Sequence, residues 1–92
     1  MIMRYGWNPS KAALNLEQHG VAFEDVDEFD WSRALVRADL GQDEKRLNAL
    51  APIGNRLHHL TFTPERRLVW VISLRRANRK EIVRYAAEVV AP

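Results

Sequence analysis

A cluster of cationic side chains lies in the last third of the chain, between an apolar run and Glu81. The stretch reads SLRRANRKE, from Ser73 to Glu81. Four cations precede that acid: Arg75, Arg76, Arg79 and Lys80. Guanidinium groups are planar and bind phosphate oxygens through two parallel hydrogen bonds. The stretch is therefore a candidate site for a phosphate or a similar anion.

Two of these arginines are expected to converge on one concave region beside a sheet. Arg75 comes two residues after Ser73, so both lie on one face if the strand extends that far. Arg79 precedes the apolar Ile82 and Val83 of a predicted helix by one turn, so we expect it to project toward the sheet. The N-terminus of that helix would add backbone donors for an anion. Three cations are expected to point outward instead: Arg76, Lys80 and Arg84. Equally, the whole cluster could be solvated or could pair with acids elsewhere in the chain.

Three histidines have side chains that titrate near neutral pH. His19 ends a stripe with Lys11 and Asn15, which are spaced four residues apart along one flank of a predicted helix. His58 and His59 are adjacent in a predicted strand, so their side chains should point to opposite faces. No histidine pair has the helical spacing of metal ligands, and the chain has no cysteine, so we predict no metal site. A Gly-rich phosphate loop is also missing, and no cofactor is predicted.

The three tryptophans could stack on nucleic-acid bases, although such residues more often anchor a core. Trp70 lies in the most strongly predicted strand, so we assign it to the core. Trp7 comes just before the start of a predicted helix and is the better candidate for the edge of a site.

The length and composition are those of one globular domain spanning residues 1–92, of which 47% are hydrophobic and 28% charged. No segment has the roughly 18 apolar residues of a membrane span, and we expect a cytoplasmic protein with no membrane partner. The net charge is only +2, but its distribution is uneven. Acids crowd residues 24–30, and cations crowd residues 66–84.

The pattern of the chain predicts an α+β fold, in the order of a short strand, two helices, about four strands and a helix. The first helix spans residues 9–19 between Asn8 and Gly20, and a short one covers residues 23–29. The first helix should bury Pro9, Ala12, Ala13 and Leu16. The predicted strands are residues 34–40, 46–54, 56–63 and 67–74, with turns at 41–45, at Gly54-Asn55 and at 64–66. A closing helix over residues 77–91 should bury an apolar arc of Ile82, Val83, Ala86, Val89 and Val90. Short connections favour an antiparallel sheet with the helices packed on it.

Two blocks of the chain resemble the BrnT family of ribonuclease toxins from type II toxin–antitoxin modules. The first is carried by Trp7-Asn8-Pro9, Lys11, Asn15, His19-Gly20-Val21, Phe23 and Phe29. The second is carried by Ser73, Arg75, Arg76, Ala77, Arg79 and Glu81. The resemblance implies a compact, RelE-like antiparallel sheet with two N-terminal helices and a C-terminal helix. It also implies RNA cleavage without metal, growth inhibition and neutralisation by a BrnA-like antitoxin, which would link the toxin to operator DNA. The RNA would be messenger RNA, with dependence on the ribosome left open.

Within this family reading, site roles can be assigned to individual residues. Arg75 and Arg79 would stabilise the charge of the transition state. Lys11 would hold the scissile phosphate, and His19 or Glu65 would transfer protons. The residues expected to bind RNA are Trp7, Asn15, Arg66, Arg76 and Lys80.

The chain also departs from the family at two places. Members usually have Glu-Arg in the turn before the last strand, where this chain has Pro64-Glu65 followed by Arg66. An arginine is common where this chain has Trp70. The alternative is therefore a catalytically weak or inactive module that binds an antitoxin or nucleic acid and acts in operon autoregulation. A DNA-binding regulator acting alone ranks last, because no helix-turn-helix is evident.

Overall fold

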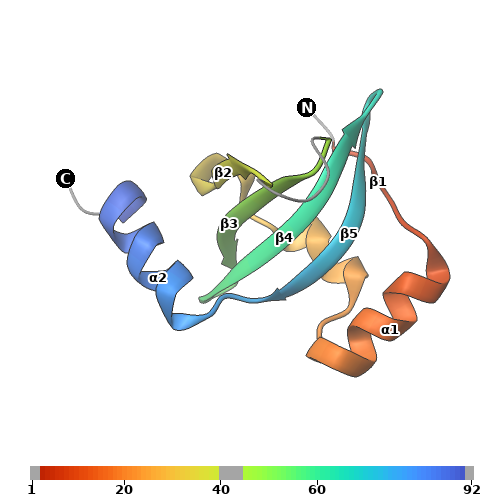
Figure 1. The fold of residues 1–92 in the computed structure, drawn as a ribbon, viewed down its shortest axis with the longest axis horizontal. Coiled ribbons are helices and arrows are strands. Elements are labelled where there is room, and N and C mark those ends of the chain that lie inside the picture. Colours follow the sequence, from red (N-terminus) through yellow and green to blue (C-terminus); the bar gives the residue numbers. More distant parts are fainter. Residues whose placement is uncertain (1–2, 40–44, 91–92) are drawn as a thin grey trace.

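A five-stranded mixed sheet forms the centre of the computed structural model, which describes residues 3–39 and 45–90 (Figure 1). The elements are β1 (Tyr5–Gly6), α1 (Pro9–His19), η1 (Phe23–Glu28), η2 (Trp31–Arg33), β2 (Leu35–Ala38), β3 (Leu47–Ile53), β4 (Arg56–Glu65), β5 (Leu68–Arg76), α2 (Arg79–Tyr85) and η3 (Ala86–Val90). The segments η1 and η2 are 3-10 helices, and η3 is a π-helical continuation of α2. The predicted succession of a short strand, helices, four strands and a closing helix agrees with the structure, but the 3-10 helix η2 between η1 and β2 was not predicted. Leu40, the predicted turn up to residue 44 and Ala91 lie outside the described residues.

The strand order is β1-β5-β4-β3-β2, in which β2 to β5 form an antiparallel meander. The edge strand β1 runs parallel to β5, pairing Tyr5 with Val69 and Gly6 with Trp70. The prediction of a purely antiparallel sheet is therefore wrong at this edge. A chain segment can join a sheet in parallel only through a long connection, and here most of the domain lies between the two partners.

Two hairpin turns lie wholly within the described residues, and the sequence predicted the position of only one of them correctly. The turn at Gly54 is where it was expected, with Gly54 in the left-handed region at a φ of 62°. The turn between β4 and β5 was expected at residues 64–66, but Pro64 and Glu65 belong to β4 and pair with β5. The turn instead consists of Arg66 and Arg67, whose backbone φ is 59° at Arg67. The register requires a two-residue connection, so this arginine adopts a conformation that usually favours glycine.

Both ends of α1 are fixed by the capping residues that the sequence indicated. The side chain of Asn8 accepts hydrogen bonds from the backbone N–H of Ser10 and Lys11, and Gly20 ends the helix at a φ of 70°. The expected buried face is confirmed only at Ala12, which packs against the core, whereas Pro9 and Ala13 are exposed. Leu16 is half exposed, and the residue that α1 buries is Asn15.

Asn15 is buried because it completes the free edge of β5, beyond the end of β1. Its side-chain amide donates to the carbonyl oxygen of Leu74 at 2.7 Å, and its oxygen accepts from the N–H of Leu74 at 3.2 Å. A third bond joins the amide to the carbonyl oxygen of Val21 at 3.0 Å. The side chain thus pairs with one strand residue much as a neighbouring strand would, and this attaches α1 to the sheet.

The hydrophobic core lies between one face of the sheet and the segment that follows α1. Its largest fully buried side chains are Phe23, Val26, Leu60, Val71 and Leu74. Two tryptophans pack at its margin: Trp7 contacts Phe23 edge to face, and Trp31 contacts Phe29 and Phe62. Trp70, which was assigned to the core, is exposed instead. It alternates with Val69 and Val71, and these two valines are the ones that enter the core.

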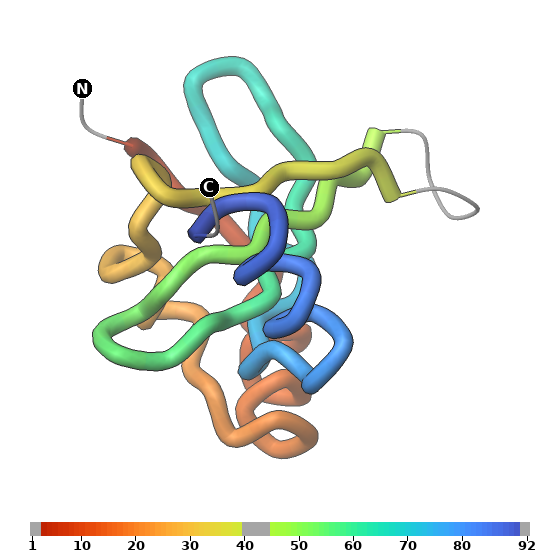
Figure 2. The backbone as a smooth tube through the Cα atoms, turned by 90° about the vertical axis from the view of Figure 1, so that its left-hand side faces the viewer, coloured from red at the N-terminus to blue at the C-terminus, as the bar shows by residue number. Residues whose placement is uncertain are grey.

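The closing helix α2 and its continuation η3 lie on the side of the sheet away from α1 (Figures 1 and 2). The expected packing of the apolar arc is wrong, because Ile82, Val83, Val89 and Val90 are exposed. The buried residues of α2 are Glu81 and Tyr85, four positions apart, and the hydroxyl of Tyr85 donates to the carbonyl oxygen of Arg33. Polar contacts therefore set the rotation of this helix. None of the helices in residues 3–39 and 45–90 is long and apolar enough to cross a membrane.

Candidate functional site

The face of the sheet opposite the core carries polar side chains from four neighbouring strands. In β4, Leu60 and Phe62 enter the core, so the alternate residues His59 and Thr61 project to the other side. Cross-strand pairing brings further residues to that side, since His59 pairs with Leu50 and Arg75, and Leu50 pairs with Leu35. We call this surface the open face, and its members are Leu35, Arg37, Asn48, Leu50, His59, Thr61 and Arg75.

A pocket of about 540 Å³ opens on this face between the sheet and α2. Strands β2, β3 and β4 and the helix α2 all contribute to its lining, which consists of Leu35, Arg37, Ala38, Asp39, Asn48, Leu50, His59 and Arg84. The two arginines of the lining outnumber its one carboxylate, Asp39. The lining therefore suits an anionic ligand better than a cation.

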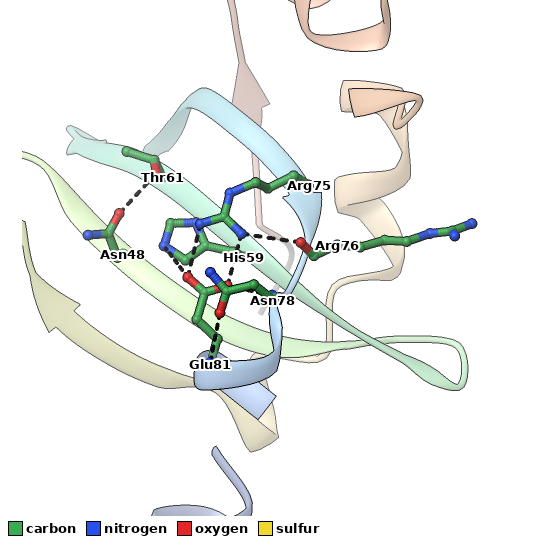
Figure 3. A network of polar contacts seen from close by, with 7 residues as sticks. All are labelled: Asn48, His59, Thr61, Arg75, Arg76, Asn78 and Glu81. Atoms are coloured by element: carbon green, nitrogen blue, oxygen red, sulfur yellow. Dashed lines mark hydrogen bonds and ion pairs between the residues drawn. The ribbon is translucent and has the colours of Figure 1, made fainter. Parts of the chain in front are cut away.

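Beside the pocket, Arg75 forms a bidentate ion pair with Glu81 (Figure 3). Both N–H···O distances are 2.9 Å, and the backbone N–H of Asn78 donates to the same carboxylate at 2.9 Å. Burial alone would raise the pKa of Glu81, but the hydrogen bonds from Arg75 and Asn78 hold this pKa below its ordinary value. Glu81 is therefore ionised at neutral pH, and Arg75 has a permanent partner.

His59 lies next to this ion pair, with its Nε2 atom 3.7 Å from a carboxylate oxygen of Glu81. Burial and the positive charge of Arg75 lower the pKa of His59, and Glu81 opposes this only in part. The imidazole is therefore neutral near pH 7 and can accept a proton. Its Nδ1 atom is buried and has no hydrogen-bond partner among the described residues. Leaving such a group unpaired costs free energy in a folded protein, and a catalytic role is one of the reasons for which it is retained.

The structure separates the residues that the sequence analysis grouped together. Arg75 meets Glu81 rather than Arg79, which is exposed at the first position of α2 and does not project toward the sheet. Arg76 extends away from the cluster in Figure 3, and Lys80 is exposed. Only Arg75 among the predicted cations therefore belongs to the open face.

The predicted residues of α1 lie on the other side of the sheet from α2 (Figure 1). Lys11 and His19 are exposed there, and neither lines the pocket. Asn15 was expected to bind RNA, but its side-chain amide is consumed by bonds to the backbone of Leu74 and Val21. The fold therefore does not place Lys11 and Arg75 in one groove.

The remaining predicted residues lie elsewhere again. Glu65 and Arg66 are exposed at the β4–β5 hairpin, and Trp7 is partly buried against Phe23. No three histidine, aspartate or glutamate side chains come together as a metal site within the described parts of the chain.

None of the eight residues that line the pocket was predicted as a site residue, and Arg84, which was expected to point outward, is one of them. The three that matter most for binding an anion are Arg37, His59 and Arg84. Alternation did predict that His58 and His59 point to opposite faces, but not which of them joins the buried side. His58 does so, with its Nδ1 atom 2.9 Å from the carbonyl oxygen of Arg56. Arg37 had no local signal at all, because its position depends on the register between β2 and β3.

Comparison with known proteins gives two matches that agree with each other. A family model described as the ribonuclease toxin, BrnT, of type II toxin–antitoxin systems matches residues 7–81. The crystal structure of the Brucella abortus ribonuclease toxin, BrnT, is 27% identical in sequence and has a TM-score of 0.69. That alignment covers 85% of this chain and 100% of the Brucella chain. No curated protein matches the sequence.

Proposed function

Because the chain belongs to the BrnT family of ribonuclease toxins of type II toxin–antitoxin systems, we propose that it is an endoribonuclease that cuts RNA on its open face. The observation that carries this proposal is the pocket in which neutral His59 lies near Arg37 and Arg84. We further propose that cleavage needs no metal, since the cationic lining can itself balance the charge of a phosphate. The RelE-like classification remains a prediction.

The proposed reaction uses the substrate's own 2′-hydroxyl as the nucleophile. The imidazole of His59 takes the proton of that hydroxyl while the 2′-oxygen forms a bond to phosphorus. The bond from phosphorus to the 5′-oxygen then breaks, water returns a proton to that oxygen, and a 2′,3′-cyclic phosphate remains. Positioned proton transfer of this kind contributes about 10²- to 10⁴-fold to a rate.

Two arginines of the pocket are assigned to the phosphate. Arg84 and Arg37 would donate to its oxygens and balance the negative charge that develops during attack. Arg37 currently bonds to Glu88 at 2.7 and 2.8 Å, but both side chains of this pair are well exposed, so a phosphate can compete for the guanidinium. Arg75 becomes a positioning residue, since its bond to Glu81 holds the start of α2 beside His59.

Cleavage of a labelled single-stranded RNA by the purified protein, in the presence of a chelator, tests this proposal. His59→Ala and Arg84→Ala should each lower the rate at least 100-fold without changing the melting temperature much. The matched control is Arg56→Ala, which removes an exposed cation from the opposite side of β4. His19→Ala and Arg79→Ala decide between the pocket and the residues first predicted. Full activity of His59→Ala with loss in His19→Ala would refute the assignment to the open face.

The competing function is a toxin-like module that binds RNA or an antitoxin without cutting. It is favoured by one specific observation, namely that two arginines of the open face, Arg37 and Arg75, already have carboxylate partners within the chain. Induction of the protein in a bacterium separates the two functions. Growth arrest that His59→Ala relieves indicates a nuclease, and unaffected growth indicates the module. In either case we propose a cytoplasmic protein that binds a BrnA-like antitoxin, which links it to operator DNA; the antitoxin would also neutralise the nuclease.

A further inference from the structure

Trp70 is an exposed aromatic residue at the third position of β5, between two buried valines. Its exposed fraction is 37%, whereas Val69 and Val71 on either side of it belong to the core. Strand β5 has a neighbour on each side, and the uncovered part of the ring is a flat aromatic surface that a ligand can cover. The valines point to the core face, which places the indole on the same side of the sheet as the open face.

The inner side of the Trp70 ring is held in place by β1. Gly6 pairs with Trp70 across the two strands, and a Cβ atom at Gly6 would come within 3.1 Å of the indole Cε3 and Cζ3 atoms. The same Cβ would lie 3.3 Å from the Cδ2 atom of Leu68. The ring therefore packs directly on the glycine backbone, an arrangement known to stabilise glycines in strands. One side of the indole is thus fixed by the protein, and the exposed remainder is available to a ligand.

A row of side chains connects Trp70 to the pocket along β4. Trp70 pairs with Thr63, and Thr61 and His59 follow on the same face at intervals of two residues. The four-residue separation of Thr63 and His59 corresponds to about 13 Å along the strand. Between them, the hydroxyl of Thr61 donates to the side-chain oxygen of Asn48 at 2.9 Å, which keeps the row polar. An extended single strand lying on this face would meet an aromatic ring, then a polar stretch, then the cationic pocket.

We propose that Trp70 is a stacking subsite for a base of single-stranded RNA, and that it fixes which nucleotide of the bound strand reaches the pocket. This rests on the proposed function, because it names the RNA subsite of the same face. Stacking on an aromatic side chain accepts every base, so the subsite supplies affinity and register rather than base identity. A duplex keeps its bases stacked inside, which makes single-stranded RNA the substrate of this surface.

The test uses binding of a short single-stranded RNA whose 2′-hydroxyls are methylated, so that the 2′-oxygen cannot act as nucleophile. Trp70→Phe keeps an aromatic face, whereas Trp70→Leu keeps an apolar cover over Gly6 and removes the stacking surface. We expect Trp70→Leu to bind on the order of 10- to 100-fold more weakly and Trp70→Phe to stay close to the wild type. Melting temperatures of both variants serve as the check on folding. Leu14→Ala, which removes an exposed apolar group from α1, is the matched control.

An abasic nucleotide placed in turn at each position of the same RNA makes the test specific to stacking. At one position of the RNA, the abasic nucleotide should weaken binding to the wild-type protein by the same factor as the Trp70→Leu substitution weakens binding of the intact RNA. The same abasic RNA should bind the Trp70→Leu protein no more weakly than the intact RNA does. Equal binding by the wild type and a folded Trp70→Leu overturns the subsite, whether or not the protein cuts RNA. Stacking at Trp70 in a protein that cuts no RNA upholds the subsite and refutes the nuclease. Failure of the wild type to bind this RNA overturns the subsite, whereas the cleavage assay on unmodified RNA decides the nuclease separately.

Discussion

Replacing Glu81 by Gln should destabilise the fold strongly, because it leaves the guanidinium of Arg75 without its charged partner. The carboxylate accepts two bonds from Arg75 and one from the N–H of Asn78, all at 2.9 Å. A glutamine retains one oxygen and presents an N–H₂ group to a guanidinium donor. Removing one partner of a buried ion pair costs about 3–5 kcal/mol. The side chain of Arg75 is 29% exposed against 10% for Glu81, so some rehydration is possible and we expect about 3 kcal/mol. For a domain of this size that corresponds to a fall in melting temperature of about 12–24 °C.

The chain contains a matched control for this substitution. Glu88 also accepts two hydrogen bonds from one arginine, Arg37, at 2.8 and 2.7 Å. The side chains of that pair are 49% and 41% exposed, so solvent already screens it. Glu88→Gln should therefore cost about 0–1 kcal/mol. Thermal unfolding followed by circular dichroism compares the two variants. Two results would show that burial does not decide the strength of these pairs. One is a melting temperature of Glu81→Gln within about 4 °C of the wild type, and the other is a fall in melting temperature of Glu88→Gln as large as that of Glu81→Gln.

The effect of Glu81→Gln should also depend on pH in a defined direction. The folded state holds the pKa of Glu81 below its ordinary value, so the unfolded chain binds this proton more readily. The stability that the carboxylate contributes is complete above the ordinary glutamate pKa, and is lost as the pH falls through the lowered pKa of the folded state. Wild type and variant should therefore differ fully at neutral pH and converge in acid. A difference that persists unchanged at pH 2 would mean that the ion pair is not its source.

The remaining predictions concern one residue on each side of the sheet. Asn15→Ala should lower the free energy of unfolding by about 2–4 kcal/mol, since it leaves the buried N–H and carbonyl of Leu74 unpaired. Leu16→Ala on the same helix, at a half-exposed position, should stay within about 0.5 kcal/mol, and urea denaturation measures both. His59→Gln should reduce the loss of stability below about pH 6.5. Because the folded state lowers the pKa of His59, the imidazole binds a proton at a higher pH in the unfolded chain than in the folded one. Falling pH therefore stabilises the unfolded state relative to the folded state, and the variant lacks the group that causes this. Urea denaturation at pH 5 and pH 7 measures this, and equal pH dependence in both proteins would contradict it.

Local signals in the sequence located most elements of the fold but not their relative rotation. The boundaries of α1 followed from Asn8, Pro9 and Gly20, because capping depends on adjacent residues. The strand β1 has two residues and a partner more than sixty positions away, so no local pattern indicated its parallel pairing. The apolar arc of α2 led to the wrong inward face. Periodicity shows that a helix is amphipathic, but it cannot show that a buried carboxylate and a tyrosine hydroxyl compete for the inward side.

The candidate site was the harder part for the same reason. Its elements come from β2, β3, β4 and α2, and their side chains meet only through cross-strand register. The motif around Arg75 was visible because its residues are adjacent in the sequence, whereas Arg37 and His59 lie far apart in it. The family resemblance was also visible, since matched blocks at the two ends of residues 7–81 need no knowledge of the register.

The cations of residues 75–80 have different roles, because Glu81 forms an ion pair with only one of them, Arg75. Glu81 occupies the third position of α2, where its side chain caps the backbone of Asn78 and its N–H bonds to the side chain of Asn78. The same carboxylate is the bidentate partner of Arg75, so one residue both starts the helix and fastens it to the sheet. That attachment places Arg84, three residues further along, in the lining of the pocket. The exposed cations remain free to attract RNA, while the partly buried Arg75 determines where the pocket forms. Loss of Glu81 should therefore reduce cleavage through Arg84 as well as stability, whereas loss of Trp70 should weaken RNA binding and change which nucleotide reaches the pocket.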